Sequence, residues 1–249
     1  MDDEALRTRL WDAFARLQAL LGRHSMQGQV IELDGVTASI VPAASDSPTL
    51  NAAVALDPDE TIAVLPELAA QWRAAKVRRW GVWIDPAARD LVRHLQRHGL
   101  TLSAGAPGMG AELDAIPLPS RNGVPLADLA TVGHVNDVAY GNHDQRLERT
   151  LTPLPAGMLK GYRADLDGAP ASVALAMHNE GDCGISFVAT IPAARRRGLA
   201  TAVMHAALED ARTQGLTTTT LQATEAGERL YRTLGYRRLC DMQLWERRR

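Results

Sequence analysis

Three consecutive arginines stand directly before a glycine and a long apolar helical pattern. Arg195, Arg196 and Arg197 precede Gly198, and the helix predicted after them runs to about Gln214. A helix N-terminus leaves about four backbone N–H groups without partners and carries roughly half a positive charge. Cations are unfavourable there unless an anion binds the same turn. The pattern therefore predicts an anion-binding turn, with a solvated basic turn as the alternative.

The helix that follows is expected to hold this turn in place. Its apolar residues cover most of its sides and are Leu199, Ala202, Val203, Met204, Ala206, Ala207 and Leu208. One narrow polar stripe is left, made of Thr201, His205, Glu209 and Arg212. A helix of this kind packs on a sheet, so its first turn is fixed rather than frayed. The small residues Gly198 and Ala200 would let the backbone approach a phosphate closely.

Two linked motifs in this region resemble those of the GNAT N-acetyltransferase superfamily. Residues 195–200, RRRGLA, fit the signature R/Q-x-x-G-x-G/A, and the V-A-T-x-P strand end precedes them at 188–192. Residues 230–236, LYRTLGY, fit the later element L-Y-x-x-x-G-F/Y. The resemblance covers Leu126 to Trp245 well and Asp2 to Pro117 only in outline. Two motifs in the right order are more specific than either alone.

The resemblance implies acetyl-CoA as co-substrate, without a metal. Backbone amides from Arg196 to Thr201 would hold the pyrophosphate, and the backbone of Phe187 to Thr190 would pair with the pantetheine arm like an extra strand. The cofactor-binding residues implied are Phe187, Val188, Ala189, Thr190, Arg195, Arg196, Arg197, Gly198, Leu199, Ala200 and Thr201.

Acetyl transfer makes further chemical demands. A primary amine must be neutral to attack, and the tetrahedral oxyanion needs a donor, for which we expect a backbone N–H near Val188. The departing thiolate benefits from an acid, and the resemblance places Tyr231 in that role. A tyrosine hydroxyl, with a pKa near 10, stays protonated at neutral pH. The alternative is that Tyr231 only packs on the core.

The general base is less well defined by the sequence. Many relatives carry a glutamate a few residues before the V-A-T of this strand, a place that falls near Gly184 in this chain. Asp182 and Glu180 are close in sequence and are expected in the turn before the strand. Asp182 is a possible base acting through a water, and a solvated turn acid is the alternative. Because this chain lacks the family's glutamate, three alternatives stay open. The amine proton could leave through a relay of water molecules, the acceptor amine could arrive already neutral, or the activity could have been lost.

The elements that would position these residues follow from periodicity and turn signals. Helices are predicted over Asp2–Gly22, Glu60–Ala75, Pro86–His98, Leu126–Tyr140, Gln145–Leu151, Arg197–Gln214 and Glu225–Leu234. Strands are predicted over Gln29–Leu33, Thr37–Val41, Asn51–Leu56, Trp80–Ile84, Thr101–Ser103, Met109–Leu113, Lys160–Leu166, Pro170–Met177, Gly184–Thr190, Leu216–Ala223 and Arg237–Trp245. Asp34-Gly35 and Asp167-Gly168 are expected to form hairpin turns.

The order strand-helix-strand-helix-strand occurs twice, over Ala52–Leu113 and Ser186–Trp245, which suggests a duplication. We expect an α/β fold (α+β mixed sheet) of two GNAT-like domains in tandem, each a central mixed β-sheet flanked by helices. A Pro- and Gly-rich linker from Pro117 to Pro125 would separate residues 1–116 from residues 117–249. The first domain is expected to be degenerate and without a cofactor motif, because Asp59–Val64 replaces the basic loop and Leu95 stands where Tyr231 would.

Composition excludes several other classes. The 249 residues carry a formal net charge of -2, which argues against nucleic-acid binding, and no apolar run is long enough for a membrane span. Cys183 and Cys240 are the only cysteines and show no metal spacing. With so few cysteines and an N-terminus unlike a signal peptide, a reduced, cytoplasmic protein is expected. We expect a monomer or homodimer.

The expected function is an acetyl-CoA-dependent N-acetyltransferase that acts on a primary amine of a small molecule or peptide, by direct attack in a ternary complex. The alternative is a non-catalytic acyl-CoA-binding sensor or regulatory protein, which the missing strand glutamate favours. A tandem transferase that uses aminoacyl-tRNA would need a broad basic surface, which the near-neutral charge does not provide.

Overall fold

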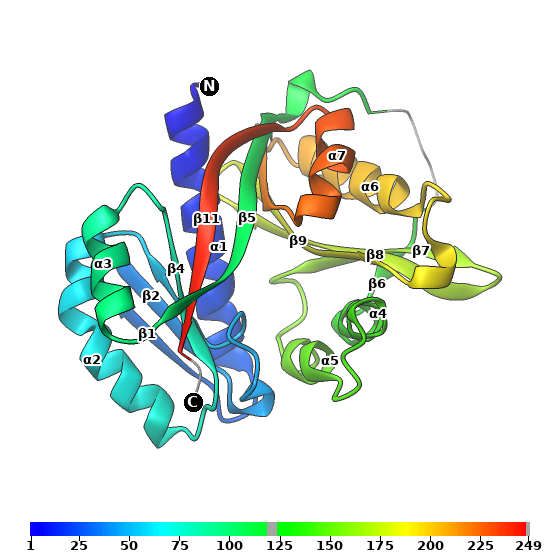
Figure 1. The fold of residues 1–249 in the computed structure, drawn as a ribbon. Helices are drawn as coiled ribbons and strands as arrows, with labels where there is room; N and C mark the ends of the chain where they lie inside the picture. Colours follow the sequence, from blue (N-terminus) through cyan, green and yellow to red (C-terminus); the bar gives the residue numbers. More distant parts are fainter. Residues whose placement is uncertain (119–123, 248–249) are drawn as a thin grey trace. The chain divides into compact units, whose positions relative to one another are not determined.

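The computed structural model describes residues 1–118 and 124–247 (Figure 1). The helices are α1 (Asp3–His24), α2 (Pro58–Ala74), α3 (Arg89–Arg97), α4 (Leu129–Tyr140), α5 (Arg146–Leu151), α6 (Leu199–Thr213) and α7 (Glu225–Thr233). The strands are β1 (Gln29–Leu33), β2 (Val36–Ile40), β3 (Ala52–Ala55), β4 (Trp80–Ile84), β5 (Thr101–Glu112), β6 (Leu126–Ala127), β7 (Lys160–Leu166), β8 (Ala169–Asn179), β9 (Asp182–Thr190), β10 (Thr218–Gln222) and β11 (Arg237–Arg247). Short 3-10 helices cover Pro42–Ala44 (η1), Leu113–Ala115 (η2) and Pro192–Ala194 (η3).

The described strands form one mixed sheet in the order β1-β2-β3-β4-β11-β5-β10-β9-β8-β7-β6. The pairs β3–β4 and β9–β10 are parallel, whereas the hairpins β1–β2, β7–β8 and β8–β9 are antiparallel. The predicted mixed α/β class is therefore confirmed. The expectation of two separate sheets is corrected, because the strands follow one another in a single order.

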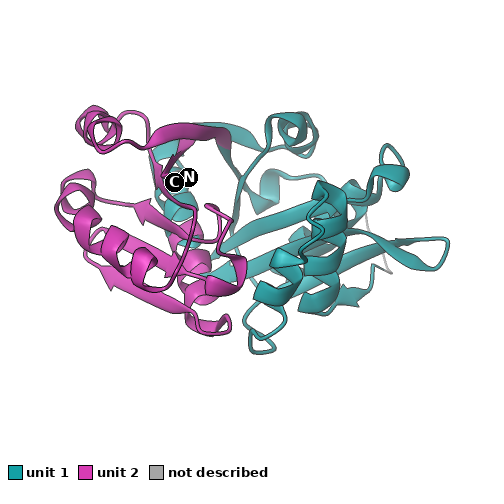
Figure 2. Ribbon diagram, turned by 60° about the horizontal axis from the view of Figure 1, so that its bottom comes forward, with its two compact units in different colours: residues 1–13, 108–239 teal, residues 14–107, 240–249 magenta. Residues whose placement is uncertain are grey.

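The chain divides into two compact units that are interleaved in sequence (Figure 2). Unit 1 holds residues 1–13 and 108–239, and unit 2 holds residues 14–107 and 240–249. The elements α1, β5 and β11 contribute residues to both units. The domain boundary at 116/117 stays a prediction, and Pro119 and Gly123 of the predicted linker lie outside the described residues.

Both predicted repeats show the expected element order, β3-α2-β4-α3-β5 and β9-α6-β10-α7-β11. Their last strands are exchanged between the units. In unit 1, Gly108–Glu112 of β5 pair with β10, and in unit 2, Gln243–Arg247 of β11 pair with β4. Each unit is thus completed by the final strand of the other repeat, which the sequence pattern does not reveal.

Helices cover both faces of the sheet in unit 1. In Figure 1, α6 and α7 lie on one face, and α4 and α5 lie on the other. The core under α6 and α7 includes Met109, Ile185, Val203, Met204, Leu208, Leu221, Tyr231 and Tyr236. Of the apolar residues predicted for the helix after Gly198, Val203, Met204, Ala207 and Leu208 are buried, whereas Leu199, Ala202 and Ala206 are partly buried. The predicted stripe therefore faces the core of unit 1.

Unit 2 has its own core between α2, α3 and the strands that they cover. It includes Ile40, Leu65, Leu68, Trp72, Ile84, Leu91, Leu95 and Trp245. Trp72 is fully buried, and its indole N–H donates to the backbone oxygen of Ser39 at 2.9 Å. This bond satisfies the one polar atom of a large buried ring.

Several predicted boundaries in the first half are wrong for local reasons. The Asp57-Pro58 pair begins α2 instead of only breaking a strand, because the Asp57 carboxylate accepts from the amides of Asp59 and Glu60 and Pro58 lies at the first helical position. α1 continues past Gly22, where a side chain would clash with the backbone oxygen of Gln29. The strands predicted at 101–103 and 109–113 are one continuous strand, β5.

Two boundaries in the second half also differ. Leu126–Ala127 form the short strand β6 paired with β7, and Asp128 then caps α4 through the Thr131 amide. β9 begins at Asp182 rather than Gly184, so Asp182 lies in the strand and not in the preceding turn. The two predicted hairpins are confirmed, and positive φ angles at Gly35 and Gly168 accompany their tight turns.

Candidate active site

The first turn of α6 is open to an anion. Gly198 is the N-cap residue with φ of 77°, a left-handed conformation that glycine adopts without steric cost. Within the described chain, no side chain caps this helix, and its first backbone bond runs from the Ala202 amide to the Gly198 carbonyl. The amides of Leu199, Ala200 and Thr201 therefore have no helical acceptor. A side-chain carbon at position 198 would meet open space, so a phosphate has room.

The three predicted arginines do not share one role. The Arg195 guanidinium donates to the backbone oxygen of Thr190 at 3.2 Å and to that of Ala139 at 3.0 Å. It thus ties the end of β9 to the last turn of α4, where a cation is favourable. Arg196 and Arg197 are exposed and form no ion pair with the described residues. These two are free to face an anion at the α6 turn.

A bulge interrupts β9 just before that turn. Val173 of β8 pairs with Ala189 and Leu175 pairs with Ser186, so Phe187 and Val188 together oppose the single residue Ala174. Phe187 has φ of 51°, an unusual backbone conformation for a large side chain. A bulge leaves its extra residue out of the strand ladder and re-aims the backbone. The predicted oxyanion donor, the Val188 N–H, lies in this bulge.

β9 and β10 also part at this point. Their parallel pairing runs from Asp182–Thr218 to Ile185–Leu221 and ends there, although β9 continues to Thr190. In the described structure, Ser186, Ala189 and Thr190 pair with β8, Phe187 and Val188 lie in the bulge, and no strand pairs with the other edge of this stretch. An open strand edge accepts an extended chain that carries amide groups. The predicted pantetheine-binding residues, Phe187 to Thr190, all lie on this edge.

Tyr231 lies on α7, inside unit 1. Its side chain is only 7% exposed and packs edge-to-face on Tyr236, with ring centroids 5.9 Å apart. Burial, followed by the nearby Tyr140, raises the pKa of Tyr231 well above its usual value. The hydroxyl is thus a proton donor throughout the neutral range. The geometry supports the packing role, and the role as acid stays a prediction.

Asp182 is placed quite differently from the solvated turn acid that the sequence suggests. It is 1% exposed, and its carboxylate accepts from the hydroxyls of Thr218 at 2.7 Å and Thr220 at 2.6 Å. Burial raises its pKa in spite of these hydrogen bonds. Phe187 is five residues further along β9, about 16 Å at roughly 3.3 Å per residue. This placement favours a structural role for Asp182, and its role as base stays a prediction.

The position of the missing glutamate is occupied by another part of unit 1. A side-chain carbon added at Gly184 would lie 3.1 Å from the Cβ of Ala13 on α1. A longer side chain does not fit there unless α1 moves, so packing explains the glycine. Cys183 is fully buried, and burial raises the pKa of its thiol, which makes it a poor nucleophile.

Neither a metal-binding cluster nor a membrane-spanning helix is found among the described residues. Within residues 1–118 and 124–247, no group of three or more His, Cys, Asp or Glu side chains is arranged to hold a metal ion. Over the same residues, every helix falls short of the length or the apolar character that a bilayer crossing requires.

Comparison with known proteins agrees with this geometry. Residues 136–236 match the family model described as Acetyltransferase (GNAT) family. None of the curated proteins compared with the chain matches it. The match includes the bulge of β9, the open turn at Gly198 and Tyr231.

Solved structures resemble the chain over most of its length. A GCN5-related N-acetyltransferase from Kribbella flavida has 21% sequence identity and a TM-score of 0.67, covering 95% of this chain and 94% of that one. A GCN5-related N-acetyltransferase from Sphaerobacter thermophilus has 16% identity and a TM-score of 0.60, with coverage of 86% and 76%. A tandem GNAT protein from the clavulanic acid biosynthesis pathway has 14% identity and a TM-score of 0.57, with coverage of 85% and 78%.

These identities are low, so the structural matches establish likeness of fold. The family model and the two motifs lie on the same part of the chain as the open turn of α6. Residues 136–236 of this chain therefore belong to the GNAT superfamily.

Proposed function

We propose that the chain transfers the acetyl group of acetyl-CoA to a primary amine of a small molecule or peptide, by direct attack in a ternary complex. The observation that carries this proposal is the uncapped N-terminus of α6, held open by Gly198 inside a GNAT domain. The GNAT family uses acyl-CoA, and a diphosphate is the anion that such a turn suits.

The two ends of the cofactor would meet different groups. The amides of Leu199, Ala200 and Thr201 would donate to the diphosphate, and Arg196 and Arg197 would add positive charge. The open edge of β9 from Ser186 to Thr190 would pair with the amide groups of the pantetheine arm. This arrangement would bring the thioester carbonyl to the bulge at Phe187 and Val188.

The chemical step then follows from the groups around the bulge. A neutral amine attacks the thioester carbon, and the Val188 N–H would stabilise the oxyanion that develops. When the tetrahedral intermediate collapses, the C–S bond breaks and the Tyr231 hydroxyl would protonate the CoA thiolate, after which the Tyr231 phenolate would regain a proton from water. The proton lost by the amine would pass to water. Cys183 takes no part, because it is buried with a raised thiol pKa.

The lack of a carboxylate at position 184 restricts the acceptor. An alkyl amine with a pKa near 10.4 is only about 0.1% neutral at pH 7.5, whereas an α-amine with a pKa near 8 is about one quarter neutral. Gly184 is packed on Ala13 and Asp182 is bonded to threonines, so neither position supplies a free base for the first kind of amine. We therefore expect acceptors of low pKa, such as α-amines and aryl amines, to react fastest.

The lack of a carboxylate at position 184 also favours the second candidate function, a non-catalytic acyl-CoA sensor. The open turn of α6 and the edge of β9 would still bind the cofactor, but no acceptor would be acetylated. The two functions share CoA binding and differ only in turnover.

The test is release of free CoA thiol from acetyl-CoA, measured against a panel of amines of graded pKa, with binding measured separately by calorimetry. The proposal expects amine-dependent thiol release that is faster for amines of lower pKa. Tight CoA binding without turnover on any amine would establish the sensor. An absence of CoA binding would overturn both.

A further inference from the structure

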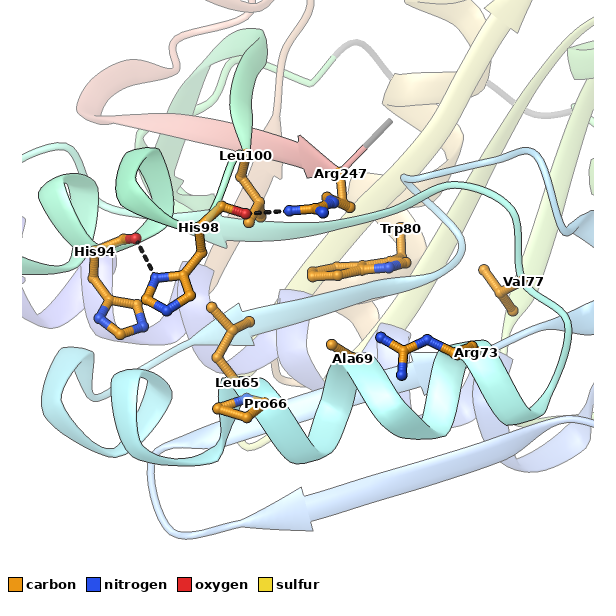
Figure 3. A pocket seen from close by; sticks show the side chains of 10 residues that line it. All are labelled: Leu65, Pro66, Ala69, Arg73, Val77, Trp80, His94, His98, Leu100 and Arg247. Carbon is orange, nitrogen blue, oxygen red and sulfur yellow. Dashed lines mark hydrogen bonds between the residues drawn. The ribbon is translucent and has the colours of Figure 1, made fainter. Parts of the chain in front are cut away.

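Unit 2 contains a pocket of about 250 Å³ that has no part in acetyl transfer as described above. Its lining comes from α2, α3, β4 and the end of β11 (Figure 3). In the figure, the α2 residues Leu65, Ala69 and Arg73 lie on one side of the opening, and Trp80 and Arg247 face them. All of these residues belong to unit 2, so the pocket is formed within one compact body.

The central wall of the pocket is aromatic. The Trp80 ring stacks on the buried Trp72, with ring centroids 4.5 Å apart and planes 14° from parallel. Trp80 also lines the pocket and is only half-buried, so part of its ring remains available to an occupant. Because Trp72 fixes the orientation of this ring, Trp80 offers a rigid surface for stacking a planar group.

The charge of the lining is entirely positive. Arg73 and Arg247 contribute guanidinium groups, and none of the lining residues is acidic. Arg247 donates to the backbone oxygen of His98, which holds it at the rim. The backbone oxygen of Arg73 accepts from the Lys76 amide, but the Arg73 guanidinium has no ion-pair partner among the described residues. Two cations without a carboxylate between them favour an anionic group.

A pair of histidines forms the end of the pocket. The rings of His94 and His98 stack with centroids 4.1 Å apart, and the Nδ1 atom of His98 bonds to the backbone oxygen of His94 at 2.9 Å. Burial, followed by the charges of His98 and Arg97, lowers the pKa of His94. Its Nε2 atom is buried without a hydrogen-bond partner in the described structure. An unsatisfied polar atom in a pocket wall indicates a group that completes it.

We propose that this pocket binds a small aromatic carboxylate of one or two rings. The ring would stack beside Trp80, and the carboxylate would face Arg73 and Arg247. A volume of about 250 Å³ is roughly eight times the ~30 Å³ share of one water molecule, which suits such an acid and is too small for coenzyme A. The proposal concerns unit 2 alone and does not depend on acetyl transfer.

The test is ligand binding to the full chain by calorimetry and by saturation-transfer NMR, with 2-naphthoate and benzoate as probes. For about ten non-hydrogen atoms we expect a dissociation constant of about 1 mM or below. Benzyl alcohol, which lacks the charge, and cyclohexanecarboxylate, which lacks the aromatic ring, should each bind more weakly. If benzyl alcohol or cyclohexanecarboxylate bound with the same affinity as benzoate, the assignment of the ligand class would be overturned.

Two variants localise the binding. Ala69→Leu places a larger side chain in the pocket from a helix position and should abolish binding. Arg73→Gln removes a guanidinium that has no ion-pair partner among the described residues. This change should weaken binding of the carboxylate about two- to fivefold, as expected for the loss of an exposed ion pair. Arg89→Gln, at the start of α3 and outside the lining, is the matched control and should change nothing.

Three further results would overturn the proposal. They are no binding of either acid at millimolar concentration, unchanged binding in Arg73→Gln, and an equal loss in Arg89→Gln. If Ala69→Leu does not fold, Arg73→Gln and the neutral and non-aromatic probes still decide the question.

Discussion

The helices α2 and α6 occupy equivalent places in the two repeats, and their N-termini differ in one decisive way. At α2, the Asp57 carboxylate accepts from the amides of Asp59 and Glu60, at 2.8 and 3.1 Å. At α6, Gly198 stands at the N-cap without a side chain, and the first turn holds no acid. The first helix end is capped by a carboxylate of the protein, whereas the second has no capping side chain in the described structure.

The comparison extends to the last helix of each repeat. Leu95 of α3 is fully buried and provides only packing contacts. Its counterpart Tyr231 is also buried, yet it carries a hydroxyl whose proton is retained because burial raises the pKa. The first repeat therefore has the same order of helices and strands as the second, but it lacks both the uncapped helix N-terminus and the buried tyrosine hydroxyl. This difference supports the prediction that the first half is a degenerate copy, and it can be tested at each position.

The largest expected effect is on turnover. Tyr231→Phe removes only the hydroxyl, so kcat should fall about a hundredfold while CoA affinity stays the same. Steady-state kinetics and calorimetry check the two quantities. Tyr236→Phe is the matched control, because the Tyr236 hydroxyl pairs with Thr219 and should affect stability but not kcat. Since the pKa of Tyr231 is raised, its proton is retained from pH 6 to 9, and kcat should show no basic limb due to this phenol.

Equal loss of kcat in the two tyrosine variants would remove Tyr231 from the mechanism. It would also make Tyr231 the structural equivalent of Leu95.

The next largest effect is on CoA binding. Gly198→Val forces a β-branched residue into a left-handed conformation, at a cost of about 1–3 kcal/mol, so CoA affinity should fall about tenfold to a hundredfold. Gly168→Val is the control, because Gly168 also has a positive φ and open space around it but lies in a hairpin turn. Melting temperatures should fall in both variants, and CoA affinity only in the first. Unchanged affinity in Gly198→Val would argue against the open turn as the diphosphate site.

The arginines should show a smaller and divided effect. Arg196→Gln and Arg197→Gln should each weaken CoA binding about two- to fivefold at low salt, with the difference shrinking as salt is added. Arg195→Gln should mainly lower the melting temperature, because its guanidinium bonds to the carbonyls of Thr190 and Ala139. Titration calorimetry at two salt concentrations separates these effects. A salt-independent affinity in every variant would indicate recognition by the backbone alone.

The smallest effect on ligand binding is expected in the first repeat. Asp57→Ala removes the cap of α2 and should lower the free energy of unfolding by about 1 kcal/mol. The stoichiometry should remain one CoA per chain, because Asp59 and Glu60 still place negative charge in that turn. A second bound CoA, in this variant or in the unaltered chain, would contradict the view that the first repeat has lost its cofactor site.

The local parts of the fold were predictable because their signals lie within a few residues of one another. The two Asp-Gly hairpins, the buried stripe of α6 and its glycine start all appear as predicted. Two of the wrong helix and strand boundaries also have a local cause, which is that a helix-capping residue was not identified. Asp57 and Asp128 were interpreted as a strand break and as part of a helix, but each caps the helix that follows.

The chemistry of the site was predictable only in part. Residues 195–201 and Tyr231 were identified by motif, and the structure places them at an open helix end and on a buried helix face. The bulge at Phe187 has no clear signal, since a positive φ at a phenylalanine follows from the register with β8. The partners of Arg195 lie five residues away at Thr190 and on α4 at Ala139, so no local pattern reports them both.

By itself, the sequence determined the order of helices and strands, the glycine-started basic turn and the absence of metal spacing, because each depends on neighbouring residues. Only the tertiary structure decided which strand completes each unit, why residue 184 is glycine and why Asp182 is buried. Those outcomes depend on contacts between distant segments: β5 with β10, Ala13 with Gly184, and Thr218 and Thr220 with Asp182. Periodicity reports which face of an element is apolar, but it does not report which distant element will cover that face.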